Sequence, residues 1–146
     1  MAFKAWHVPV RLATGAYILN SGLQKRNADK ETAAGLHGFA SSAFPEVADM
    51  PPERFASLLS AGEIAVGAAL LTPFVPTATA GAALSTFSGM LMRLYLKTPG
   101  LREEGSLRPS QAGGPVSKDV WMVGIGTALL LDAISDRLHG RGKARD

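Results

Sequence analysis

The sequence contains no cysteine and is short of charge. The absence of cysteine excludes a disulfide scaffold and a cysteine-ligated metal centre. Charged residues make up 18% of the chain, whereas soluble domains average about 25%. The 47% content of hydrophobic residues argues against a disordered chain. With 146 residues, the chain has the length of one domain.

The few charges are unevenly distributed, and one long stretch nearly lacks them. The 38 residues from Phe55 to Met92 contain a single charged side chain, Glu63. A helix that crosses the hydrocarbon core needs about 20 mostly apolar residues, so this stretch is long enough for two spans. Pro73 and Pro76 interrupt it near the middle. We therefore predict a membrane hairpin with spans at about 55–72 and 77–96.

Two weaker apolar segments flank this hairpin. The first, at about 6–24, contains Arg11 as its only charge, and the second, at about 119–136, includes Asp132. Aromatic residues of the type that favours the headgroup level lie at the predicted span ends: Trp6, Tyr95 and Trp121. The sequence thus predicts an all-α fold, a single integral membrane four-helix bundle covering 1–146, with both termini on one side.

The two longer loops, 25–54 and 97–118, are expected on the other side. In the first loop Leu36, Phe39, Ala40 and Ala43 recur at helical spacing, which predicts a short amphipathic helix that lies on the membrane, caps the bundle or docks a partner. The second loop lacks apolar periodicity, and we expect it to be mobile or ordered by a partner.

Small residues recur at four-residue spacing in the hairpin, a pattern that lets membrane helices approach closely. They are Ala61, Ala65 and Ala69 in its first helix, and Gly81, Ser85 and Gly89 in its second. A soluble bundle with unusually apolar helices is the main alternative, because the mean hydropathy is only +0.13. A cleaved signal peptide is another, although Arg11 would divide its apolar region.

Four ionisable residues fall within the predicted spans: Arg11, Glu63, Arg93 and Asp132. Such residues are costly in a bilayer and suggest a polar or ligand-binding cluster. Glu63 lies roughly 12 Å along its helix, near the membrane centre, where it is either protonated or paired. Two interpretations of Glu63 follow. It exchanges a proton or contacts a quinone headgroup, or it forms an ion pair with a purely structural role. Arg11 is expected to pair with Asp132 or Glu63, and Arg93 to lie near the opposite face.

The sequence contains no recognisable catalytic apparatus. It has no phosphate loop, nucleophile elbow, zinc spacing or dinucleotide fingerprint. Its three histidines, His7, His37 and His139, lie at span ends or in a loop, which argues against metal or haem ligation. The net charge of +3 is not gathered in a stripe, so we expect no nucleic-acid partner. We predict no catalytic residue, metal or resident cofactor, with a quinone as the one possible ligand.

Two motifs resemble those of a known family. Arg11-Leu12 and Gly15, followed by Gly22 and Lys25, are similar to the start of DoxX-like membrane proteins, and the segment 62–67 resembles the Gly/Glu-centred second span of that family. The resemblance implies a four-helix membrane bundle with both termini cytoplasmic. Some members are linked to quinone-reducing sulfur oxidation or to membrane oxidoreductase complexes. This chain departs from the family in its longer, more polar first loop and its lack of a redox cysteine.

These observations lead to two functional hypotheses. The first is a multi-pass accessory or binding subunit of the cell membrane, in contact with lipid and with a larger respiratory or oxidoreductase complex, and not an enzyme by itself. The second is a quinone-coupled membrane oxidoreductase subunit in which Glu63 handles a proton. A small transporter has less support, because no span is broken near its centre.

Overall fold

The structure is a computed structural model that describes residues 4–117 and 119–142. These residues form helices joined by turns and loops, with one isolated β-bridge between Arg102 and Pro109. The elements are α1 (His7–Lys25), α2 (Lys30–Ser41), the 3-10 helix η1 (Pro45–Val47), α3 (Pro52–Leu71), α4 (Thr77–Lys97), α5 (Gly114–Ser117) and α6 (Val120–Gly142). The predicted all-α fold class is confirmed.

Local sequence signals account for several helix boundaries. The side chain of Asp29 accepts a hydrogen bond from the Thr32 backbone N–H at 2.8 Å and so caps α2. Pro52 occupies the first turn of α3, where its missing N–H costs nothing, and Pro76 immediately precedes α4. The prolines thus separate α3 from α4 as expected.

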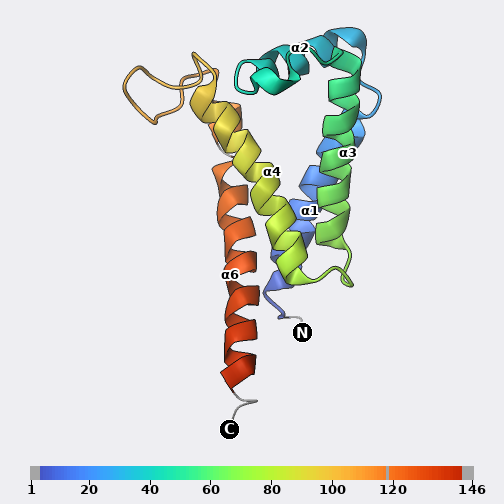
Figure 1. Ribbon diagram of the computed structural model, residues 1–146, viewed down its shortest axis with the longest axis vertical. Helices are drawn as coiled ribbons and strands as arrows, with labels where there is room; N and C mark the ends of the chain where they lie inside the picture. Colours follow the sequence, from blue (N-terminus) through green and yellow to red (C-terminus); the bar gives the residue numbers. More distant parts are fainter. Residues whose placement is uncertain (1–3, 118, 143–146) are drawn as a thin grey trace.

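The four long helices run up and down in chain order (Figure 1). The start of α1, the end of α6 and the connection 72–76 lie at one end of the bundle, which we call the turn end. The segments 26–51 and 98–117 lie at the other, which we call the loop end. Helix α2 lies across the loop end, while α3 and α4 diverge from the turn end towards it (Figure 1). The start of α1 and the end of α6 therefore share one end of the bundle with the connection 72–76, and the two longer connecting segments share the other.

Helix α1 packs mainly on α3, and α4 packs mainly on α6. Glycine permits both approaches: a Cβ on Gly67 of α3 would lie 2.6 Å from the backbone nitrogen of Leu19 in α1. In the other pair, a Cβ on Gly81 would lie 2.9 Å from the backbone nitrogen of Leu130. Apolar side chains from all four long helices then form a common core: Ile18, Leu70, Ala80, Leu84, Phe87, Met122 and Leu129.

The predicted small-residue stripes are used only in part. Ala61 and Ala65 are exposed, so they do not make the α1–α3 contact, which is made through Gly67 instead. In α4, Gly81 is buried against α6, whereas Gly89 faces open space. The four-residue spacing identified helices that make close contacts but not the face that makes them. Gly67 lies two residues from Ala65 and Ala69, and so on a different face of α3 from the predicted stripe.

The four predicted spans all correspond to helices, but their apolar character differs. Among the described residues, only α3 is both long and apolar enough to cross a membrane by length and composition. Tyr95 also departs from the expected aromatic belt: it is buried, and its hydroxyl donates to the carbonyl of Leu107 at 2.8 Å. Trp6 and Trp121 remain about 40% exposed, at 43% and 39%. Tyr95 anchors loop 98–117 rather than marking an interface.

Candidate functional site

A cavity of about 360 Å³ lies in the loop half of the bundle. Helices α1, α3, α4, the start of α6 and the α2–η1 segment all contribute to its wall. Most of the lining is apolar and much of it is aromatic: Tyr17, Phe39, Phe44, Phe55 and Phe87. Small-molecule sites fall in the same size range and have the same predominantly apolar character. The divergence of α3 from α4 is what leaves this space beneath α2 (Figure 1).

A buried ion pair forms the polar part of the cavity wall. The Nζ atom of Lys25, in the last turn of α1, lies 3.0 Å from Oε2 of Glu63 on α3. Lys25 also donates to Oγ of Ser21, one helical turn earlier, at 2.6 Å. The Glu63 side chain is only 7% exposed, and the Lys25 ammonium compensates for the burial of its carboxylate. Lys25, Ser21 and Glu63 all line the cavity.

Close backbone packing holds this pair in place. A Cβ on Gly22 would lie 2.9 Å from Cβ of Glu63, so only glycine lets α1 approach α3 this closely here. One turn along α3, the hydroxyl of Ser60 donates to the Gly22 carbonyl at 2.8 Å. The carboxylate is therefore fixed by the α1–α3 contact and directed at the end of α1.

The α2–η1 segment covers the cavity and is joined to α4. The guanidinium of Arg93 lies over the ring of Phe44 at 4.4 Å, and its Nη2 atom lies 3.5 Å from Oε1 of Glu46. The hydroxyls of Ser42 and Thr98 are 2.9 Å apart. Arg93 and Glu46 are both exposed, so this attachment is made at the surface.

Arg11 has a different environment at the turn end. It is 2% exposed, and its guanidinium donates to the backbone carbonyls of Leu70 at 2.8 Å, of Ala69 and Thr72 at 2.9 Å, and of Val75 at 3.2 Å. The last carbonyls of an α-helix have no partner within the helix. Arg11 therefore caps α3 and fixes the turn that leads to α4, with the cation placed at the negative end of the helix dipole.

Asp132 joins α6 to the start of the chain. Its carboxylate accepts a hydrogen bond from Nζ of Lys4 at 2.6 Å, and its second oxygen lies 3.0 Å from Nε2 of the buried His7. Lys4 also donates to Asp136 at 2.9 Å. These two hydrogen bonds, that to Asp132 first, raise the pKa of Lys4 above its ordinary value of 10.5. The group fastens α1 to α6 at the turn end.

The four predicted site residues therefore lie in separate surroundings. Only Glu63 lines the cavity; Arg11 and Asp132 contact groups at the turn end, and Arg93 lies at the loop end. Lys25 lies just beyond the first predicted span, at 6–24, and the sequence did not indicate that it would pair with Glu63. The four-residue spacing of Ser21 and Lys25, beside Gly22, is the signal that could have placed Lys25 against Glu63.

Comparison with known proteins assigns no relative. No family model matches the chain, and no curated protein or solved structure matches it. Within the described part of the chain, no three His, Cys, Asp or Glu side chains are grouped so that they could hold a metal ion.

Proposed function

We propose that this protein is an integral membrane binding subunit of the cell membrane, a four-helix bundle that docks to a larger respiratory or oxidoreductase complex. The observation that carries the proposal is that the long helices bury several hydrogen-bonding residues beside their apolar core and also expose several large apolar residues. A bilayer favours this arrangement, because polar groups must be satisfied inside the protein and apolar groups meet lipid.

The buried hydrogen-bonding residues are nearly inaccessible. Arg11, Glu63, Ser60 and Ser88 are each at most 5% exposed and have hydrogen-bond partners, whereas the hydroxyl of Thr14 is buried without one among the described residues. Ser60 and Ser88 donate their hydroxyl protons to backbone carbonyls, as membrane helices favour.

The exposed apolar residues occur on all four long helices. Among those at least 38% exposed are Val8, Leu12, Leu58, Met90, Leu131 and Ile134. Single exposed apolar side chains are normal on soluble proteins, but contiguous apolar faces mark contacts with lipid or partners. We propose that α1, α4 and α6 cross the membrane beside α3.

Docking is proposed through the helix faces that this chain leaves unused. Ala61, Ala65 and Gly89 are exposed small residues, and α6 extends past the other helices at the turn end (Figure 1). The resemblance to DoxX-like proteins supports an oxidoreductase complex as the partner and a cytoplasmic position for both termini. Purification from native membranes in mild detergent tests this: we expect defined partner chains to co-purify. A lone monomer without partners would contradict the proposal.

A quinone-coupled role is the second candidate, and it is favoured by the position of Glu63 on the cavity wall beside Lys25. A carboxylate there is placed to exchange a proton with a bound oxygen. The test is quinol turnover by purified complexes that carry Glu63→Gln, with the exposed Glu53→Gln on the same helix as control. Turnover lost only in the first variant would support this role, whereas equal turnover would exclude it.

A further inference from the structure

The ion pair of Lys25 and Glu63 carries no net charge, and this restricts what binds beside it. Lys25 and Glu63 neutralise each other at 3.0 Å next to the Ser21 hydroxyl, while Asp119, just before α6, adds a further carboxylate to the cavity lining. An anionic head would have to displace Glu63 from Lys25, and a cationic head would have to displace Lys25 from Glu63. Each exchange leaves a charge without its partner, on Glu63 at 7% or on Lys25 at 22% exposure, which is costly. A neutral head that donates and accepts hydrogen bonds incurs neither cost.

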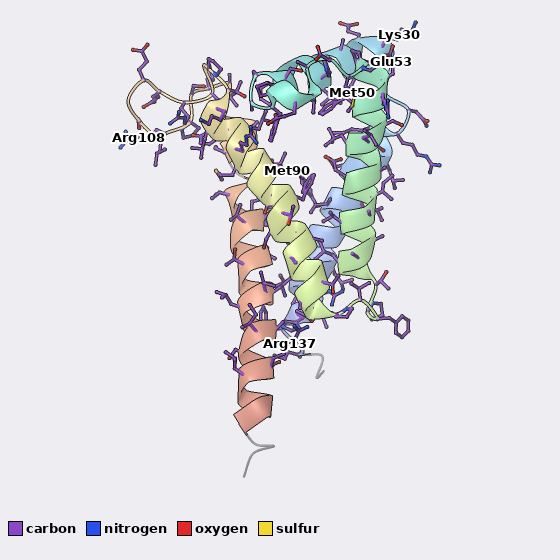
Figure 2. The ribbon with its side chains drawn as sticks, in the orientation of Figure 1. Lys30, Met50, Glu53, Met90, Arg108 and Arg137 are labelled. Atoms are coloured by element: carbon purple, nitrogen blue, oxygen red, sulfur yellow. The ribbon has the colours of Figure 1, made fainter. Side chains whose placement is uncertain are left out.

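A second groove adjoins the cavity and shares Phe87 and Met90 with it. It lies among α3, α4 and α6 and is lined by small residues, among them Gly62, Ala78, Ala82 and Ala83, together with Leu130 and Arg137 of α6. Met90 is 49% exposed although it lines the cavity, so it lies at an opening. Figure 2 labels it on α4 at the level where α3 and α4 diverge. The opening faces sideways from the bundle, towards the lipid in the proposed orientation.

We propose that the cavity binds a neutral, single-chain amphiphile. Its hydroxyl or carbonyl head contacts Lys25, Glu63 and Ser21, and its hydrocarbon chain leaves past Met90 along the groove among α3, α4 and α6. Aromatic rings surround the head, and the small residues of the groove make room for the chain. This inference rests on the proposed membrane function, because the side opening then faces the hydrocarbon from which such a molecule enters.

A photoreactive monoacylglycerol of medium chain length is the probe that tests this site. The purified full-length protein is placed in phosphatidylcholine nanodiscs, irradiated with the probe, and the cross-linked residues are identified by mass spectrometry. We expect saturable cross-linking to peptides that contain Leu59, Phe87 and Met90. Unlabelled monoacylglycerol should compete about ten-fold better than a fatty acid of the same length, since only the fatty acid brings a negative charge to a lining that already holds the carboxylates of Glu63 and Asp119.

A pair of neighbouring substitutions separates cavity binding from general lipid contact. Leu59 lines the cavity, whereas Leu58 is 56% exposed on the outer face of the same helix. Leu59→Trp fills the site and should lower saturable cross-linking about ten-fold, while Leu58→Trp should leave it unchanged. Equal yields from the two variants, or labelling that never saturates, would overturn the proposal.

Glu63→Gln tests the head chemistry. This variant leaves Lys25 without its carboxylate, so the fatty acid should now compete about ten-fold better than it does against the wild-type protein. An unchanged preference would overturn the assignment of the head to this pair. Cross-linking by phosphatidylcholine probes at the same peptides would show ordinary bilayer lipid as the occupant and would also overturn it. Failure of binding in a protein that stays in nanodiscs would leave the membrane function standing, which keeps the two proposals distinguishable.

Discussion

The two ends of the bundle each contain an arginine, and the two side chains differ in burial and in hydrogen-bond partners. At the turn end, Arg11 is buried and donates to four backbone carbonyls that close α3 and its turn. At the loop end, Arg93 is exposed and holds only Phe44 and Glu46, across the surface of the α2–η1 segment. At the turn end, Arg11 therefore fixes α1 firmly to the end of α3. At the loop end, the α2–η1 segment covers the cavity and is attached to α4 more weakly. A charged residue within an apolar segment can therefore be either a buried structural donor, as Arg11 is, or a surface contact, as Arg93 is.

Removal of the buried guanidinium should have the largest effect. Arg11→Met leaves the carbonyls of Ala69, Leu70 and Val75 without their donor, while the Thr72 carbonyl keeps the Val75 N–H, and each unsatisfied buried polar group costs about 1–3 kcal/mol. We expect a loss of about 3 kcal/mol or more in the free energy of unfolding, measured by SDS titration in mixed micelles. Arg11→Lys should restore only part of it, because an ammonium cannot reach carbonyls on both sides as the planar guanidinium does. A loss of less than about 1 kcal/mol in the free energy of unfolding would contradict a stabilising role for Arg11 at the end of α3.

Separation of α1 from α3 should have the next largest effect. In Gly67→Ala the new Cβ would meet the backbone of Leu19 at 2.6–2.8 Å, which forces the helices apart. Overpacking of this kind costs about 1–3 kcal/mol. The control is Gly62→Ala on the same helix, which meets nothing within 4 Å and should be neutral or slightly stabilising. Equal melting temperatures for the two variants would show that the α1–α3 contact is not close.

The ion pairs at the turn end predict a pH dependence. Because the folded protein raises the pKa of Lys4, the stabilisation is complete below the unfolded value of 10.5 and is lost as pH rises through the higher folded value. Lys4→Met should therefore lower the melting temperature by a constant amount near neutral pH, and by less above about pH 10.5. A difference that grows with alkaline pH would have the wrong sign for this arrangement.

Removal of the exposed arginine should have the smallest effect on stability. Arg93→Met breaks one surface ion pair and one cation–π contact, which together contribute about 1 kcal/mol or less. Amide hydrogen exchange should nevertheless rise in α2, since its attachment to α4 is weakened. If Arg93→Met lowered the free energy of unfolding as much as Arg11→Met does, the two ends of the bundle would not differ in how strongly their arginines stabilise the fold.

The helices were predictable from the sequence because prolines and charge-poor runs mark their boundaries locally. The pairing of the charges was not, since it depends on helix rotation and on backbone groups that carry no sequence signal. Arg11 was expected to contact a carboxylate, yet backbone carbonyls of Leu70 and Thr72 receive its protons. The cavity was also beyond prediction, because it arises from the divergence of α3 and α4 and from the covering by α2.

Single-cysteine labelling tests the central claim, the position of the bundle across a membrane, most directly. The chain contains no cysteine, so each substitution introduces a unique thiol. Phe74 at the turn end is 92% exposed and Leu107 at the loop end is 72% exposed. In intact cells, a membrane-impermeant maleimide should label Leu107→Cys, and should label Phe74→Cys only after permeabilisation. Equal labelling of both variants in intact cells would contradict a bundle that spans the membrane.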